Sequence, residues 1–209
     1  MSTAANGTQT VFIVDDDPAI RDSLTLMIEQ EGLPVLAFAS AEAFLDGCDD
    51  TAFGCAIIDI RMPGMDGMQL QEEMTKRSIL LPIVFLTGHG DIPMSVRAIK
   101  SGAVDFLTKP VTREKLLASV RTALQSGSQL LEKIARIQHT RALLAELTER
   151  ESEVMTLAVL GHPNKEIARK LGISHRTVEI HKAKIMHKTG AVNLLDLARI
   201  AQEGGLSSI

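Results

Sequence analysis

Carboxylates, a hydroxyl and an amine follow short apolar runs of this sequence. They are Asp15, Asp16 and Asp17 after residues 11–14, Asp59 after 55–58, Thr87 after 83–86 and Lys109 shortly after 106–107. Carboxylates gathered in one cleft repel one another unless a hard cation binds, and an octahedral oxygen site with few protein ligands suits Mg²⁺. A lysine and a hydroxyl beside them would meet an anion held over the metal. The set predicts phosphoryl transfer to a carboxylate, with an Asp as nucleophile.

The elements that must position these groups are predicted by the hydrophobic pattern of the first 125 residues. Apolar runs at 11–14, 35–38, 55–58, 83–86 and 106–107 alternate with helix-period segments such as 19–31, 68–77 and 94–101. Near-continuous apolar strands are buried on both faces, so we expect an α/β domain with a doubly wound parallel sheet of five βα units. In such folds the polar chemistry collects at the carboxyl ends of the strands. Four of the five predicted strands therefore deliver a polar group to one edge of the sheet.

Each polar residue also has a structural explanation when taken alone. Asp17 precedes Pro18 and is expected to cap a helix rather than to bind a ligand. Asp59 could be solvated, Thr87 could cap a turn, and Lys109 could lie on the surface. Their coincidence at the predicted strand ends favours a site.

Residues 112–147 are predicted to be helical, with residues 126–128 as a weak point. An apolar stripe runs through residues 130–137. The stripe suits a linker that lies against its own neighbours, or a helix that pairs with a second chain. The linker interpretation is slightly favoured.

The sequence after Leu147 has a purely helical pattern. Thr148 and Glu151 form a capping-box signature, and the helix that they begin ends at residues 161–163. A second helix runs from Asn164 to Gly172, a third from the cap Ser174 to Gly190, and a fourth over residues 193–201. Two short helices joined through residues 172–174 predict a helix-turn-helix in an all-α domain of four helices.

Charge is distributed unevenly along the chain. Residues 1–128 hold 10 Lys/Arg against 17 Asp/Glu, whereas residues 140–209 hold 10 against 8. An acidic half joined to a mildly basic one suggests a cation- or phosphate-handling module attached to a module that binds a polyanion. Trp and Tyr are absent, which argues mildly for duplex DNA over single strands.

The sequence has no pattern typical of a membrane span, a signal peptide, or a cysteine-based metal site or disulfide. No apolar run approaches the ~20 residues needed to cross a bilayer, and residues 1–10 lack the features of a signal peptide, so a cytoplasmic protein is expected. Cys48 and Cys55 have neither metal-site nor disulfide spacing and are interpreted as structural thiols.

Residues 10–125 resemble a response-regulator receiver domain. The motifs that carry the resemblance are Val14-Asp15-Asp16, Asp59-Ile60-Arg61-Met62-Pro63-Gly64-Met65-Asp66-Gly67, Thr87-Gly88 and Lys109-Pro110. The resemblance implies phosphorylation of Asp59, a Mg²⁺ site made by Asp15, Asp16, Asp59 and the Arg61 carbonyl, and phosphoryl contacts from Thr87 and Lys109. It also implies a cis Lys109–Pro110 bond. Phe106 matches the aromatic switch residue, and a plain core role for it is nearly as well supported.

Residues 88–94 look like those of the FixJ-type subgroup. That resemblance implies dimerisation through the surface of residues 92–101 after phosphorylation, with Val96 and Lys100 in the interface. His89 is expected to be a loop residue rather than a metal ligand.

Residues 145–205 are similar to the LuxR-type helix-turn-helix. The matching residues are Leu147-Thr148-Glu149-Arg150-Glu151, Asn164-Lys165-Glu166-Ile167-Ala168, Leu171-Gly172-Ile173-Ser174, Thr177-Val178-Glu179 and His181. The family inserts the helix from Ser174 to Lys188 into the major groove. Backbone contacts are thereby implied for Asn164, Lys165, Thr177, Lys182, Lys184 and Lys188, and base contacts for Glu179, Ile180 and Ala183.

Helical spacing independently agrees with this orientation. Val178, Ile185 and Met186 form an inward stripe, whereas Arg176, Glu179, Lys182 and Lys184 are left outside, so Arg176 also joins the DNA-binding set. Two residues stay open. Glu179 could accept from cytosine N4 or pair with Lys182, and His181 could touch a phosphate or complete the core.

Together these features predict a phosphorylation-dependent DNA-binding transcriptional regulator. Its expected parts are a receiver domain (1–125), a helical linker (126–144) and a LuxR-type domain (145–209). Its expected partners are a sensor histidine kinase, double-stranded promoter DNA, RNA polymerase and a second copy of the phosphorylated chain. No enzyme activity is expected beyond self-catalysed gain and loss of the phosphoryl group on Asp59.

The sequence disfavours two rival functions. An aspartyl-phosphate phosphatase resembling haloacid dehalogenases would need a second acid two positions after the nucleophile, where this sequence has Arg61. A receiver acting through protein contacts alone, with a vestigial C-terminal domain, is disfavoured by the intact turn and the basic third helix.

Overall fold

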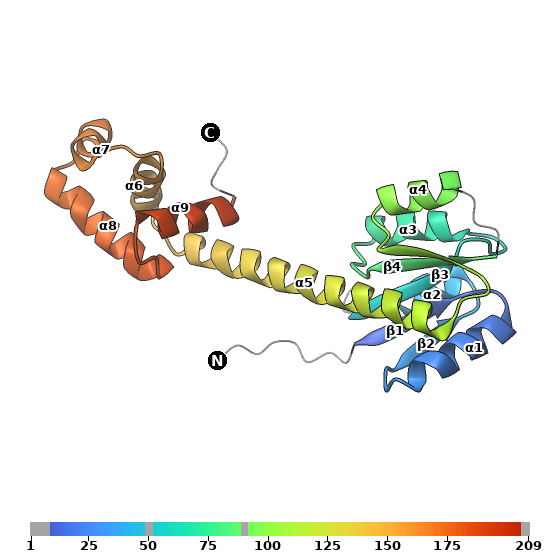
Figure 1. Cartoon of the computed structure of the whole chain (residues 1–209). Coiled ribbons are helices and arrows are strands. Elements are labelled where there is room, and N and C mark those ends of the chain that lie inside the picture. The colour runs from blue at the N-terminus through green and yellow to red at the C-terminus, as the bar shows by residue number, and fades with distance from the viewer. Residues whose placement is uncertain (1–8, 49–51, 89–91, 206–209) are drawn as a thin grey trace. The chain divides into compact units, whose positions relative to one another are not determined.

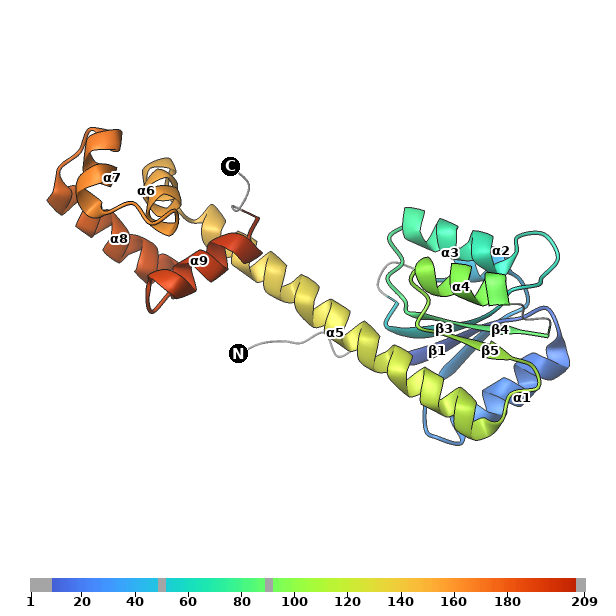
Figure 2. The same ribbon diagram turned by 45° about the horizontal axis from the view of Figure 1, so that its top comes forward.

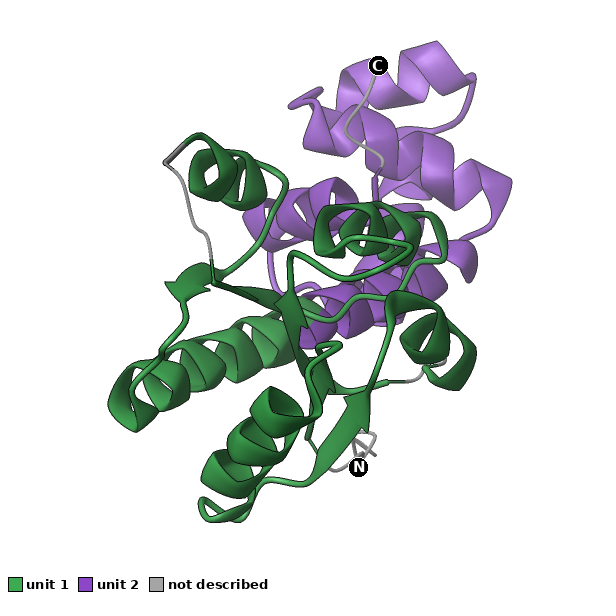
Figure 3. Cartoon of the chain, turned by 90° about the vertical axis from the view of Figure 1, so that its right-hand side faces the viewer, with its two compact units in different colours: residues 1–130 green, residues 131–209 purple. Residues whose placement is uncertain are grey.

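The computed structural model describes residues 9–48, 52–88 and 92–205, and the chain divides into two compact units, residues 1–130 and 131–209 (Figure 3). Residues 1–8, which belong to the segment that lacks signal-peptide features, and His89, which is expected to be a loop residue, lie outside the described residues. The first unit alternates strands and helices, in the order β1 Thr10–Val14, α1 Pro18–Glu29, β2 Val35–Phe38, α2 Ala41–Gly47, β3 Gly54–Asp59, α3 Gly67–Lys76, β4 Ile83–Thr87, α4 Ile92–Lys100, β5 Asp105–Thr108 and the start of α5 Arg113–Ala145.

The five strands form one parallel sheet in the order β2-β1-β3-β4-β5. Side chains from α2, α3 and α4, such as Phe44 and Leu70, fill the core on one face of the sheet. Those from α1 and α5, such as Ile28 and Leu116, fill the core on the other face. Figures 1 and 2 show the two layers of helices on opposite sides of the sheet. The predicted doubly wound architecture is confirmed.

Local capping determines where the helices of this unit begin. The carboxylate of Asp17 accepts a hydrogen bond from the Ala19 amide at 2.8 Å, which confirms its predicted capping role. Asp66 and Gln69 form a reciprocal capping box at the start of α3. The short helix α2 was not identified from the sequence, although Ser40 caps it.

Helix α5 runs without a break through the predicted weak point at residues 126–128. Close packing explains the glycine at position 127. A Cβ on Gly127 would lie 3.1 Å from the Gly54 carbonyl oxygen and 3.3 Å from the ring of Pro82. The glycine therefore permits close packing of α5 on the first unit and does not end the helix.

The second unit is helical throughout its described elements. After the end of α5 it contains α6 Glu149–Val159, α7 Asn164–Leu171, α8 His175–Thr189 and α9 Leu194–Glu203. Thr148 and Glu151 form the predicted capping box, and Ser174 and Asn193 cap α8 and α9. Gly172 has a φ of 66°, which suits glycine and turns the chain from α7 to α8. The predicted four-helix domain with a helix-turn-helix is confirmed.

Cys48 and Cys55 are both buried, as expected of structural residues. Burial raises the pKa of the Cys55 thiol to about 12. Among the described residues, no helix combines the length and the apolar character that a membrane span requires.

Candidate functional site

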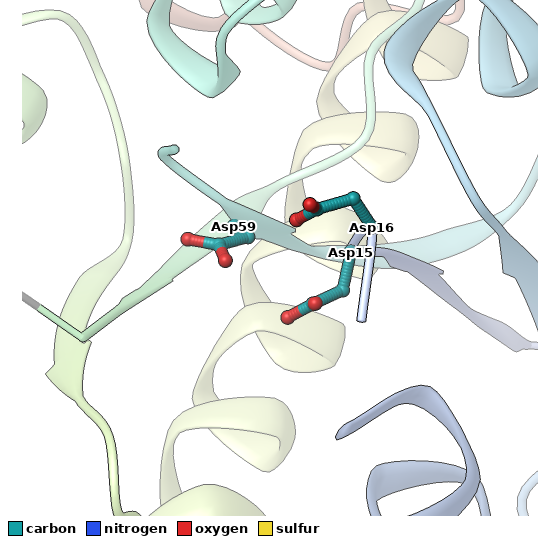
Figure 4. Close-up of side chains that lie close together, drawn as sticks. All are labelled: Asp15, Asp16 and Asp59. Carbon is teal, nitrogen blue, oxygen red and sulfur yellow. The ribbon is translucent and has the colours of Figure 1, made fainter. Parts of the chain in front are cut away.

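Three carboxylates meet at the carboxyl ends of β1 and β3. Oxygens of Asp15, Asp16 and Asp59 lie within 4.8 Å of one another, and Figure 4 shows the three side chains beside one another. Asp15 and Asp59 are only 1% and 6% exposed, whereas Asp16 is exposed. The cluster thus has two buried carboxylates and one that solvent reaches.

Lys109 joins the cluster from the segment after β5. Its Nζ donates to an oxygen of Asp15 and to an oxygen of Asp59, both at 2.6 Å. The Lys109 side chain is 17% exposed. The Lys109 ammonium therefore bridges Asp15 and Asp59, which lie 94 and 50 positions before it in the chain. The sequence predicts that these residues meet, because the carboxyl ends of parallel strands lie at one edge of the sheet.

The electrostatics of the cluster are those of a partly buried charge network. Burial raises the pKa of the Asp15 carboxyl above its usual value, and the hydrogen bonds from Lys109 and the Asp17 amide offset only part of this effect. Burial lowers the pKa of Lys109, but its hydrogen bonds to Asp15 and Asp59 and the charges of both carboxylates outweigh burial, so the pKa lies above its usual value. Lys109 is therefore positively charged at neutral pH.

Backbone groups hold the carboxylates in place. The Asp17 amide donates to Asp15 at 3.0 Å, and the Arg61 amide donates to Asp59 at 3.1 Å. Gly67 packs against the strand that carries Asp59, because a Cβ at Gly67 would lie 2.4 Å from the Asp59 carbonyl oxygen. The loop after β3 thus folds back closely beneath Asp59.

Thr87 lies on β4, next to the strand that carries Asp59, and Phe106 lies on β5, one strand further along the sheet. Thr87 ends β4 and is fully buried, and its carbonyl accepts from the Lys109 amide at 2.7 Å. Phe106 pairs in register with Phe85 and is partly buried against the core beneath α2, α3 and α4. The Lys109–Pro110 peptide bond is cis, as the resemblance implied.

Helix α4 presents an apolar and basic outer surface. Val96 and Ile99 are 46% and 47% exposed, and Arg97 and Lys100 are exposed beside them. Both predicted interface residues, Val96 and Lys100, are therefore accessible on one helix.

In the second unit, α7 and α8 present the predicted DNA-binding side chains. Val178 and Ile185 are fully buried, and Met186 packs against the same core. The exposed members of the predicted set are Lys165, Arg176, Glu179, Ile180, Ala183 and Lys184, and the partly buried members are Asn164, Thr177, Lys182 and Lys188. The inward stripe predicted from helical spacing is confirmed.

Three basic or hydroxyl groups of this set already have partners within the unit. Lys182 donates to the Asn164 side chain at 3.0 Å, which brings together two predicted phosphate contacts. The Thr177 hydroxyl lies 2.8 Å from that of Ser174 at the helix cap. Lys188 donates to the buried carboxylate of Glu151 at 2.7 Å and to the Glu146 carbonyl at 2.9 Å, so two of its three N–H groups serve the fold.

The two residues left open by the sequence have distinct surroundings. Glu179 lies 3.6 Å from His175, one turn earlier, whereas Lys182 bonds to Asn164. Glu179 therefore approaches His175 and not Lys182, the partner that helical spacing suggested. His181 is partly exposed, and its buried Nδ1 has no hydrogen-bond partner within the described part of the chain.

Some contacts that build these sites were not predicted from the sequence. Arg21 donates to the Asp15 carbonyl at 2.6 Å, and Arg150 donates to the carbonyl of Leu171 at the end of α7. Glu151 was recognised as a cap, but its pairing with Lys188, 37 positions away, carried no local signal.

Comparison with known families gives two matches. The family "Response regulator receiver domain" matches residues 11–121, and "Bacterial regulatory proteins, luxR family" matches residues 145–201. The first match spans more than half of the chain and contains every residue of the acidic site.

Curated relatives match nearly the whole chain. Transcriptional regulatory protein FixJ of Bradyrhizobium diazoefficiens is 40% identical over 196 residues, which cover 94% of this chain and 96% of that protein. Response regulator protein TmoT of Ectopseudomonas mendocina is 41% identical over 192 residues, which cover 92% of this chain and 87% of that protein.

Solved structures agree with the sequence comparisons. The response regulator StyR matches with a TM-score of 0.82 and 39% identity, over 94% of this chain and all of that chain. Full-length FixJ from B. japonicum matches with a TM-score of 0.58 and 39% identity, over 97% of this chain and all of that chain.

Proposed function

Because this chain belongs to the FixJ-type two-component response regulators, with a receiver domain followed by a LuxR-type DNA-binding domain, it is a transcriptional regulator, and we propose that phosphorylation of Asp59 controls its binding to DNA. The observation that carries the proposal is the Lys109 ammonium bridging Asp59 and Asp15 at 2.6 Å beside Asp16.

In the proposed reaction, a carboxylate oxygen of Asp59 attacks the phosphorus of a phosphohistidine on a sensor kinase. The new O–P bond forms as the P–N bond breaks, and the imidazole leaves with its bonding electron pair and takes up a proton. Lys109 moves from bridging carboxylates to neutralising a phosphoryl oxygen, and the Thr87 hydroxyl donates to another. The chain itself catalyses only the gain and loss of this group.

The acidic residues fit a magnesium ion. Their donors are all oxygen, they lie within 4.8 Å of one another, and exposed Asp16 leaves an approach from solvent. Asp15, Asp16, Asp59 and the Arg61 carbonyl would hold the ion. When bound, Mg²⁺ supplies positive charge that offsets the charge of the phosphoryl oxygens.

We propose that the phosphoryl group acts on α4 through Thr87 and Phe106. The modification adds ~1.5 to 2 negative charges and three acceptor oxygens at Asp59. Thr87 would turn towards these oxygens, and the Phe106 ring would move into the space that Thr87 leaves. The surface carrying Val96 and Lys100 then favours a second phosphorylated copy.

The dimer would place two copies of α8 on two half-sites of promoter DNA. The net charge of residues 140–209 is only slightly positive, so a single domain is expected to bind weakly. Dimerisation raises the effective concentration of the second domain. We propose that the bound dimer acts on RNA polymerase, and that all of this takes place in the cytoplasm.

Intact mass spectrometry with a small phosphodonor and Mg²⁺ tests the chemistry. The native chain should gain one phosphoryl group, and Asp59→Asn should gain none. Asp17→Asn is the matched control, because Asn also caps a helix and Asp17 lies outside the cluster, so this variant should be phosphorylated normally. Phosphorylation of the Asp59→Asn chain to the native level would rule out Asp59 as the acceptor.

A further inference from the structure

An isoleucine stands exposed on the outer surface of α8. Ile180 is 47% exposed, although Val178 and Ile185 of the same helix are fully buried. A β-branched residue is also a poorer helix former than the Ala, Lys or Glu that commonly occupy solvent-facing positions. Neither core packing nor helix propensity explains Ile180.

The surroundings of Ile180 match the chemistry of a DNA groove. Arg176 and Lys184 lie one turn before and one turn after it, and both are exposed, as is Ala183. A small apolar surface is thus flanked by two cations along the helix, with the exposed carboxylate of Glu179 next to it. Cations suit phosphates at the edges of the major groove, and the apolar feature on the groove floor is the C5 methyl group of thymine.

We propose that Ile180 contacts a thymine methyl group in each half-site and thereby selects thymine at that position. The proposal rests on DNA binding by α8, which is itself proposed above. A protein partner for Ile180 is less well supported, because the flanking cations complement a polyanion.

The test begins by selecting duplexes from a random-sequence pool with the full-length chain treated with a phosphodonor. Each thymine of the selected site is then replaced by deoxyuridine, which lacks only the methyl group, and affinity is measured by fluorescence anisotropy. At one position per half-site the native chain should bind the uracil duplex about fourfold more weakly, the effect of one buried methyl.

Ile180→Ala should bind the thymine and uracil duplexes equally well at that position. Ile180→Gln, which replaces the branched apolar side chain with a polar one, should also lose the preference for thymine over uracil. This second variant tests the proposal if the alanine variant folds poorly. Leu160→Ala is the matched control, since Leu160 is 62% exposed but lies outside α8, and it should keep the full preference.

Equal thymine-to-uracil ratios for the native and Ile180→Ala chains at every position would overturn the inference, as would selected half-sites without thymine. In both cases specific DNA binding would survive. Selection of no preferred duplex at all would instead remove the proposed DNA-binding function and this inference with it.

Discussion

Lys109 places one positive charge between two carboxylates that would otherwise repel each other. It approaches Asp15 and Asp59 equally closely, at 2.6 Å, and its raised pKa keeps the ammonium charged. Burial already raises the pKa of Asp15, so the cluster tolerates little further loss of positive charge. In the proposed reaction Asp59 attacks as the anion, so we expect the Lys109 ammonium beside it to influence its reactivity.

Lys109→Met should slow phosphorylation of Asp59 by on the order of 100-fold, the scale of losing one preorganised charge. The rate is measured by time-resolved intact mass spectrometry with a phosphodonor. Lys115→Met, an exposed position on α5, should react at the native rate. A native rate for Lys109→Met would mean that the bridge has no part in the reaction.

Gly67 has no Cβ, and this allows the start of α3 to pack closely against the Asp59 backbone. Gly67→Ala would place a methyl group 2.4 Å from the Asp59 carbonyl oxygen, where the backbone must shift. We expect a loss of about 1 to 3 kcal/mol in the free energy of unfolding, as for other overpacked sites, and slower phosphorylation. Chemical denaturation followed by circular dichroism measures the first effect. Gly88→Ala, where a Cβ meets nothing within 4 Å, should cost much less.

Among the elements, the long periodic ones could be predicted and the short one could not. The five apolar runs became β1 to β5, and the capping signals at Thr148 and Ser174 marked the starts of α6 and α8. Helix α2 has only seven residues, too few to establish a helical period. Gly127 suggested a weak point because local propensity cannot show the close contact with Gly54 that gives the glycine its purpose.

The pairing of Glu151 with Lys188 holds α8 against α6. Hydrogen bonds from Lys188 and from the Thr148 amide lower the pKa of Glu151 from its usual 4.5 to about 2. Because the folded-state pKa is the lower one, the carboxylate stabilises the fold fully above pH 4.5, and this contribution disappears as the pH falls towards 2. The shift corresponds to at most about 3 kcal/mol.

Glu151→Gln keeps an acceptor for the capping box but removes the charge that faces Lys188. The variant should be less stable than the native chain at pH 6, and the difference should shrink steadily between pH 4.5 and pH 2. Denaturation curves at several pH values measure it, and the comparison cancels the carboxylates that both chains share. A difference that did not change with pH would assign Glu151 to packing alone.

For the whole molecule, the acidic site was more predictable than the DNA-binding surface. Asp15, Asp59, Thr87 and Lys109 meet because parallel strands bring their carboxyl ends to one edge, a rule that acts at any separation in the chain. No comparable rule predicts which basic side chains stay unpaired. Lys188, a predicted phosphate contact, also donates to a buried carboxylate that no local pattern connects to it.

The proposed coupling between the two domains predicts a separation of phosphorylation from DNA affinity. Val96→Asp adds a charge to the exposed surface of α4, far in sequence from Asp59, and like charges would face each other across a symmetric interface. The variant should accept one phosphoryl group at the native rate but stay monomeric in sedimentation experiments. Its affinity for promoter DNA should remain about 10- to 100-fold below that of the phosphorylated native chain, because the second half-site loses its effective concentration.

Leu80→Asp is the matched control for this experiment, since Leu80 is 49% exposed on the connection between α3 and β4 and lies outside α4. It should dimerise and bind DNA as the native chain does when phosphorylated. If the native chain bound DNA equally well with and without the phosphodonor, phosphorylation would not control binding, whatever its effect on α4. If instead Val96→Asp bound as tightly as the native phosphorylated chain, the signal would have to reach α8 by a route other than dimerisation through α4.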